Sequence, residues 1–212
     1  MRIALINENS QAAKNSMVYE TLKKVADVKG YEVDNYGMYS ADDEAQLTYV
    51  QAGLLTAILI NSGAADFVVT GCGTGEGAML ACNSVPNVLC GHVVDPSDAY
   101  MFSQINNGNA IALPFAKGFG WGAELNLTYI FEKLFEGEPG GGYPKERVVP
   151  EQRNKKILDD VKKITHVDML TILKTIDQDF LKATVSGAKF KELFFANCKC
   201  PDIKAYIESV LA

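Results

Sequence analysis

Short apolar runs alternate with segments of helical periodicity along most of the chain. Each run is bounded by polar residues or glycine, as is typical of buried strands. The predicted strands cover residues 3–6, 31–36, 67–70, 88–90 and 110–113. Strands that alternate with helices form parallel sheets through right-handed crossovers. The pattern therefore predicts an α/β fold, a three-layer α/β/α sandwich around a five-stranded parallel, Rossmann-like sheet.

Capping signals mark where two of the predicted helices begin. Asn9 or Ser10 follows the first predicted strand and is a candidate N-cap. Asp95 followed by Pro96 supplies an N-cap and a proline at the first helical position. We therefore expect helices to begin at both points.

A stretch rich in glycine and proline, residues 137–144, ends the alternating pattern. Beyond it the periodicity is helical only, with apolar residues at three- and four-residue spacing over residues 157–164 and with Pro201 opening a last helix. The sequence thus predicts an α/β domain over residues 1–150 and a helical C-terminal extension over residues 151–212.

Composition narrows the class of protein. The 212 residues, 48% hydrophobic and 22% charged, suffice for one large domain or for a domain with an appendage. The net charge of -6 and the absence of a Lys/Arg cluster disfavour nucleic-acid and membrane partners. With no signal-peptide layout and no apolar run of about 18 residues, we expect a cytoplasmic protein. Five cysteines, none in a Cys-x-x-Cys pair, fit free thiols in a reducing compartment.

One loop combines the features of a catalytic site. Residues 70–77, with the sequence TGCGTGEG, place Cys72 among four glycines where the third predicted strand turns into a helix. Glycines let backbone N–H groups approach a ligand closely, and a helix N-terminus adds partial positive charge. The same field favours the thiolate form of a cysteine. The loop is therefore a candidate site for an anion and a nucleophile or base.

Common cofactor sites do not match this loop. A nucleotide triphosphate loop requires Gly-Lys-Ser/Thr, and no lysine is present. The dinucleotide motif Gly-x-Gly-x-x-Gly follows the first strand, whereas Gly73-Thr74-Gly75-Glu76-Gly77 is one residue short and follows the third. The two histidines, His92 and His166, lie in unrelated contexts, so no metal-binding cluster is evident. We expect neither a cofactor nor a metal.

Several short motifs together resemble the family of type B ribose-5-phosphate isomerases and galactose-6-phosphate isomerase. In the family's order they are Cys72-Gly73-Thr74-Gly75-x-Gly77, Ala81-x-Asn83, Asp95-Pro96-x-x-Ala99, Asn106-x-x-Asn109 and Arg147-Val148. The resemblance covers residues 1–150. It implies a metal-independent aldose–ketose isomerase that works through an enediolate. It also implies a homodimer or homotetramer in which each site is completed across an interface.

The resemblance also implies roles for individual residues. Cys72 would be the base that removes a proton from carbon, a role that requires a base close to the substrate carbon. The Thr74 hydroxyl and the loop N–H groups would hold the enediolate oxygens, and Glu8 would move protons between them. The residues expected to bind substrate are Asn9, Gly73, Gly75, Gly77, Asn83, Asn106, Asn109 and Arg147.

Three departures from the family pattern affect the choice of substrate. The ring-opening histidine is Ile105 here, so either another group opens the ring or the substrate arrives in open-chain form. Asn9 stands where the family has a histidine, and Tyr143 where it has one of two phosphate-binding arginines, so Arg147 alone remains. A carboxylate needs only one arginine, which favours the keto acid 4-deoxy-L-threo-5-hexosulose uronate. A sugar phosphate stays open, because Lys117 could supply charge, as could Lys145.

Other readings remain beside the enzymatic one. The lost histidine and arginine also fit a catalytically silent family member kept for binding or assembly, although Cys72, Thr74 and Asn106 are retained. His92 follows a strand end, where a structural role is the more common one. For cysteines in apolar segments, such as Cys82 and Cys90, core packing is the expected role.

Overall fold

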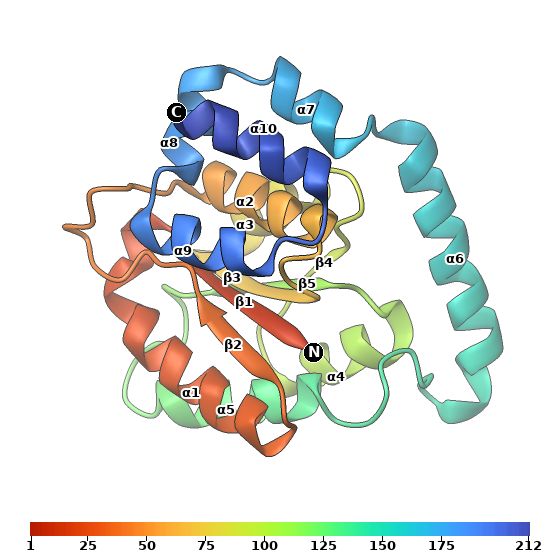
Figure 1. The fold of residues 1–212 in the computed structure, drawn as a ribbon. Helices are drawn as coiled ribbons and strands as arrows, with labels where there is room; N and C mark the ends of the chain where they lie inside the picture. Colours follow the sequence, from red (N-terminus) through yellow and green to blue (C-terminus); the bar gives the residue numbers. More distant parts are fainter.

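The computed structural model describes residues 1–212 and contains a five-stranded parallel sheet (Figure 1). Its strands are β1 (Arg2–Asn7), β2 (Glu32–Asn35), β3 (Phe67–Cys72), β4 (Cys90–His92) and β5 (Ala110–Pro114). Their order across the sheet is β2-β1-β3-β5-β4. The predicted α/β class and the existence of all five strands are confirmed, although β4 begins at Cys90, two residues later than predicted. The third strand is longer than predicted, because Gly71 and Cys72 still pair with β5.

Helices cover both faces of the sheet, and the strands divide their side chains between two hydrophobic cores. Along β1, Ile3 and Leu5 face one core while Ala4 and Ile6 face the other, as the pleat of a strand requires. The first core lies under α1 (Asn15–Val28), α4 (Pro96–Met101) and α5 (Ala123–Leu134), and the second under α2 (Tyr49–Ser62) and α3 (Glu76–Asn83) (Figure 1). Both faces are thus buried, which explains the continuous apolar runs of the strands.

The capping predictions have mixed outcomes. The Asp95 side chain accepts a hydrogen bond from Asp98 N at 2.9 Å, with Pro96 at the first helical position, as predicted. After β1, however, a 3₁₀ segment, η1 (Asn9–Lys14), precedes α1, and its N-cap is Glu8. Ser10 N donates to Glu8 Oε2 at 2.8 Å, so the prediction of Asn9 or Ser10 as the cap is wrong. The carboxylate of Glu8 takes the capping position because it immediately follows the strand.

The C-terminal part consists of helices only. These are α6 (Val148–Thr165), α7 (Met169–Thr175), α8 (Gln178–Val185), α9 (Ala188–Asn197) and α10 (Pro201–Leu211). Helix α6 runs along the edge of the molecule, and α7, α8 and α10 cover the outer side of α2 (Figure 1). Helix α9 lies beside β2, where Asn197 Nδ2 donates to Asp34 Oδ2 at 3.0 Å. Buried side chains of these helices, such as Leu181, Phe194 and Ile207, belong to the same core as Val68 of the sheet. The extension is therefore continuous with the core of the sandwich.

The C-terminal helices that cover α2 explain why this helix is apolar on all sides. All residues from Gln51 to Leu59 are buried, and all but Gln51, Gly53 and Thr56 are apolar. A helix that is hydrophobic all round must be enclosed on every side. Here the sheet and α3 enclose it from one side and the extension from the other. No helix of the chain combines the length and apolarity needed to cross a membrane.

Replacing Phe194 by alanine tests whether the extension and the sandwich are one cooperative unit. Phe194 is fully buried and stacks on Phe190, whose ring lies 6.3 Å from that of Tyr36. We expect Phe194→Ala to lower the free energy of unfolding by about 3–5 kcal/mol, with a single transition in urea. The control Val28→Ala, at a side chain 84% exposed, should change it by less than about 0.5 kcal/mol. Two separate transitions would show that the extension folds independently.

Candidate active site

The candidate site lies at the carboxyl edge of the sheet. Cys72 ends β3 opposite Pro114 of β5, and Glu8 and Asn9 follow β1, which pairs with β3 on its other side. Carboxyl ends of parallel strands meet at one edge, so the topology brings these residues together. Cys72 is 8% exposed and Glu8 only 3%. A thiol and a carboxylate are thus both held at the rim of a buried core.

Glycine is required at two positions of the Cys72 loop. At Gly71 a Cβ atom would lie 2.3 Å from Leu113 O, and at Gly75 it would lie 2.8 Å from the His92 ring. Gly75 also has a φ of +81°, which L-residues rarely adopt. The chain then enters α3, where Glu76 N donates to Thr74 Oγ1 at 3.3 Å. The remaining first-turn N–H groups of α3 are free to bind an anion.

His92 fixes the loop from β4. Its Nε2 lies 2.9 Å from Thr74 O, and since a carbonyl only accepts, Nε2 carries the proton. This bond fixes the orientation of the peptide between Thr74 and Gly75. The histidine therefore orients the loop, in keeping with the structural role expected from sequence.

Sequence reasoning missed a hydrogen-bonded chain in η1. Lys14 Nζ donates to Gln11 Oε1, Gln11 Nε2 donates to Ser10 Oγ, and Ser10 Oγ donates to Glu8 Oε1 at 2.6 Å. Lys14 also donates to the carbonyl of Phe115, directly beyond β5. The chain holds the Glu8 carboxylate in place and brings an ammonium group to this edge of the sheet. The three-residue spacing of Gln11 and Lys14 could have indicated this chain, because residues three apart lie side by side in a 3₁₀ helix. The sequence pattern, however, did not reveal that this segment is a 3₁₀ helix.

Two of the predicted substrate-binding residues hydrogen-bond to backbone groups of the fold. Asn83 Oδ1 accepts from Cys90 N at 3.0 Å and Asn83 Nδ2 donates to Cys90 O at 2.8 Å, which joins the end of α3 to β4. Asn109 Oδ1 accepts from Leu89 N, and Asn109 Nδ2 donates to Asn87 O. Their side-chain amides are thus committed to backbone groups.

Asn106 and Arg147 lie away from Cys72 within the chain. Asn106 ends the π-helical turn η2 (Phe102–Asn106) at the amino side of β5, whereas Cys72 lies beside the carboxyl end of that strand. The five residue steps from Asn109 to Pro114 span about 16 Å. Arg147 ends η3 (Lys145–Arg147), with a side chain 63% exposed and its Nε 3.7 Å from Glu151. One chain therefore brings together Glu8, Asn9, Cys72 and the glycine loop, but not these two residues.

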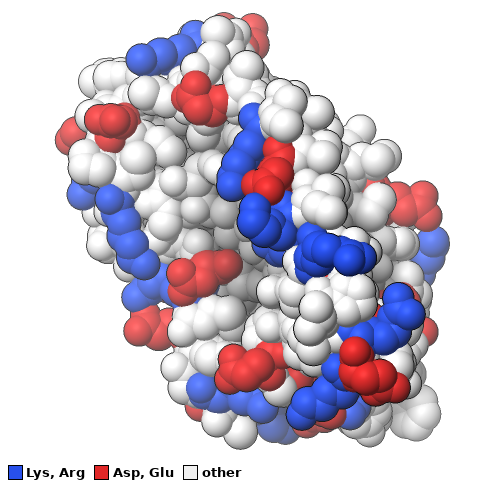
Figure 2. Space-filling model, turned by 90° about the vertical axis from the view of Figure 1, so that its right-hand side faces the viewer, with Lys and Arg blue, Asp and Glu red and all other residues white.

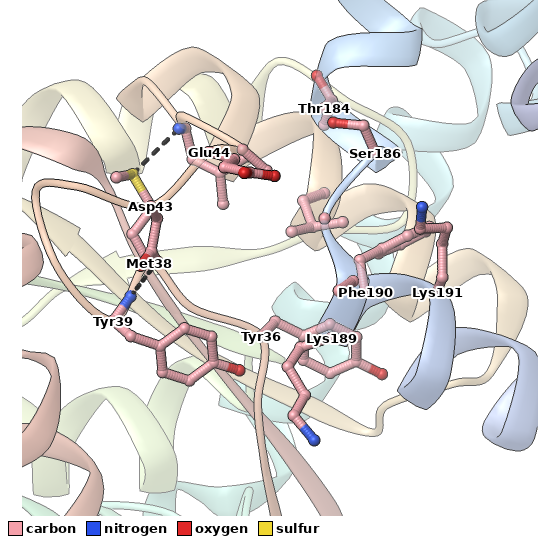
Figure 3. Close-up of a pocket in the computed structure, with 15 residues that line it drawn as sticks. Tyr36, Met38, Tyr39, Asp43, Glu44, Thr184, Ser186, Lys189, Phe190 and Lys191 are labelled. Carbon is pink, nitrogen blue, oxygen red and sulfur yellow. Dashed lines mark hydrogen bonds between the residues drawn. The ribbon is translucent and has the colours of Figure 1, made fainter.

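A cavity of about 580 Å³ lies beside this site without including Cys72. It separates the β2–α2 loop from the extension, and Figure 3 shows Tyr36 and Tyr39 of that loop facing Phe190 and Lys189 of α9. The loop is tied to the site, because Asn9 N donates to Leu47 O at 2.7 Å. The extension contacts this region through Phe190, whose ring lies 6.3 Å from that of Tyr36. No group of three or more His, Cys, Asp or Glu side chains is arranged to hold a metal ion.

Comparison with known proteins identifies relatives of this fold and site. A family model described as Ribose/Galactose Isomerase matches residues 3–137, and a second, described as Ribose-5-phosphate isomerase, matches residues 164–210. A crystal structure of a 4-deoxy-L-threo-5-hexosulose-uronate ketol-isomerase, complexed with a tartrate, is 69% identical, with a TM-score of 0.98 over 100% of this chain and 99% of that one.

Two further structures differ in how much of the chain they match. A ribose-5-phosphate isomerase from Vibrio parahaemolyticus is 53% identical, with a TM-score of 0.96 over 100% of this chain and 99% of that one. One from Thermotoga maritima is 24% identical, with a TM-score of 0.55, and covers 75% of this chain and 97% of its own. The first family model spans more than half of the chain, and two relatives match its full length. The chain therefore belongs to the ribose/galactose isomerase family and is a sugar isomerase.

Proposed function

We propose that this isomerase interconverts the carbonyl positions of an open-chain sugar acid, with 4-deoxy-L-threo-5-hexosulose uronate as its substrate. The observation that carries the proposal is the 69% identity, over the full length, to a ketol-isomerase of that compound. Ribose 5-phosphate is the second candidate, supported by the isomerase from Vibrio parahaemolyticus at 53% identity.

The charges available for the substrate's anionic group favour a carboxylate. Of the positions matched to the family's phosphate contacts, Asn9 and Tyr143 are uncharged and Arg147 keeps a guanidinium. One guanidinium can bind one carboxylate through two parallel hydrogen bonds, whereas a phosphate dianion is better held by two cations. Ile105 cannot transfer a proton, which also fits a substrate that arrives in open-chain form.

Cys72 is the proposed base. Its thiolate removes the proton from the carbon next to the carbonyl, the electron pair of that bond forms the double bond of the enediolate, and the carbonyl oxygen gains negative charge. The thiol then returns the proton to the neighbouring carbon. Free N–H groups at the start of α3 and the Thr74 hydroxyl would stabilise the charged oxygen. Removing one such donor typically costs roughly 3 kcal/mol of barrier.

Glu8 is the proposed carrier of the second proton, which moves between the two substrate oxygens. Its carboxylate is 3% exposed and is held by two bonds from Ser10, at 2.8 Å to the backbone N and 2.6 Å to the hydroxyl. Each carboxylate oxygen has a second lone pair with which it can accept a substrate proton. The hydrogen-bonded chain from Lys14 keeps this group in one orientation.

A second copy of the chain is proposed to complete each site. Asn106 and Arg147 belong to the family motifs but lie at the opposite edge of the sheet from Cys72. Close to them, α6 exposes an apolar face. Its members are 46–84% exposed and are Ile157, Leu158, Val161 and Ile164. Burial of this face against a partner, in a homodimer or homotetramer, would place Asn106 and Arg147 of one copy near Cys72 of another.

Replacing Cys72 by alanine tests the assigned base. We expect Cys72→Ala to lower kcat for 4-deoxy-L-threo-5-hexosulose uronate by roughly 10²–10⁴-fold, because general-base catalysis supplies acceleration of that order. The measurement is proton NMR in heavy water, which follows turnover and deuterium incorporation at carbon, with ribose 5-phosphate in a parallel reaction.

Cys198→Ala is the matched control, since Cys198 is a half-buried thiol in the extension, away from the carboxyl edge. This variant should retain wild-type kcat. Turnover of ribose 5-phosphate alone would contradict the proposed substrate. No turnover of either compound by the wild type would favour the silent, assembly role.

Mixing two inactive variants tests whether copies share sites. Neither Cys72→Ala nor Arg147→Ala should be active alone. If one copy supplies Cys72 and the other Arg147, each mixed dimer has one intact site, so an equimolar mixture refolded together should recover about a quarter of wild-type activity. Isomerisation rates before and after mixing provide the measurement. Absence of recovery, with mixed dimers verified by two affinity tags, would place both residues in the same site.

A further inference from the structure

Helix α6 turns charged residues toward its own chain. Lys155, Asp159 and Lys162 lie at three- and four-residue spacing on the side facing the body, half-buried or buried, while most of its apolar residues face outward. Such a helix is not held to the body by hydrophobic packing. Figure 2 views the molecule from the side of α6 and shows Lys and Arg side chains gathered beside a hollow in this face.

A polar cavity of about 240 Å³ lies between α6 and the loops at the amino ends of β4 and β5. Only one of its nine lining residues, Leu89, is hydrophobic. The lining residues are Asn87, Leu89, Asn107, Gly108 and Asn109 from the loops and Lys155, Asp159, Lys162 and Lys163 from α6. Three lysines and one aspartate give the lining a net charge of +2.

Lys162 is the one lysine of the lining without a carboxylate partner. Its side chain is 8% exposed, and its Nζ donates to Asn83 O at 2.9 Å, at the end of α3. Lys155 pairs with Asp159 at 2.6 Å and Lys163 with Asp160 at 3.5 Å, but no acidic side chain pairs with Lys162. Burial lowers the pKa of Lys162 below its ordinary value. An ammonium has three donors, so two remain for a ligand, and a buried cation is stabilised by an opposite charge.

The loop side of the cavity also offers donors. Asn107 Nδ2 donates to Gln152 Oε1 at 3.1 Å and Asn87 Nδ2 donates to Asn61 Oδ1 at 2.7 Å. Because an amide nitrogen carries two hydrogens, each keeps one N–H. Lysine and amide donors on opposite walls are the groups that bind oxyanions.

We propose that this cavity binds a small oxyanion, a phosphate group or a dicarboxylate, that joins α6 to the loop of Asn107. Lys155 and Lys163 have carboxylate partners on the helix, so Lys162 carries the unbalanced positive charge that a bound oxyanion would offset. The site is separate from Cys72, which does not line it, and it does not depend on the proposed substrate.

The test measures binding of inorganic phosphate, and in a second arm succinate, to the full-length protein by calorimetry, with sodium chloride at matched ionic strength as the reference. We expect saturable binding of at least one of the two anions, accompanied by a rise in Tm that chloride does not produce. Lys162→Met and Lys163→Gln should each weaken the Kd at least tenfold. Because the Lys163 side chain is 67% exposed, Lys163→Gln should fold normally even if replacing the buried Lys162 does not.

Lys156→Gln is the matched control. Lys156 lies on the same helix, 76% exposed, and does not line the cavity, so its loss should leave the Kd unchanged. Cys72→Ala should also bind as the wild type does. The proposal is overturned if neither anion binds more tightly than chloride, if both lysine variants bind as the wild type, or if Cys72→Ala abolishes binding. A preference for phosphate or for succinate identifies which anion the cavity takes.

Discussion

Cys72 reaches the edge of the sheet on a strand that packs too closely against its neighbour to carry a side chain at Gly71. The space beside Gly71 is occupied by Leu113 O and by the ring of Phe115. This close approach sets the register in which Cys72 lies opposite Pro114. The loop, the start of α3 and the bond from His92 to Thr74 all depend on that register. Backbone packing therefore determines together the positions of the thiol and of the first-turn N–H groups of α3.

Much of this architecture can be predicted from sequence because short-range residue patterns determine it. Buried strands of a parallel sheet need apolar residues on both faces, and the five runs show that composition directly. Asp95 with Pro96 begins α4 as its chemistry dictates. The Gly-rich loop was recognisable from its composition alone, although two of its glycines, Gly71 and Gly75, are required by contacts with the neighbouring strands β5 and β4.

What could not be predicted depends on groups distant in the sequence or on competition between neighbours. Glu8 displaced Asn9 and Ser10 as the cap of η1, although all three can accept a backbone hydrogen bond. Asn83 matched a motif, but its amide pairs with the backbone of Cys90 at the start of β4, a contact that the motif does not reveal. The sequence shows that α6 has an apolar and a polar face, because its apolar residues recur at three- and four-residue spacing. It does not show which of the two faces packs against the rest of the chain.

The enclosure of α2 has a consequence for the chain itself. The side of α2 that faces away from the sheet is apolar and is covered by α7, α8 and α10. A chain that ended before these helices would leave that side open to water, and apolar surface exposed in this way promotes association. The C-terminal helices are therefore part of what keeps the sheet domain from aggregating.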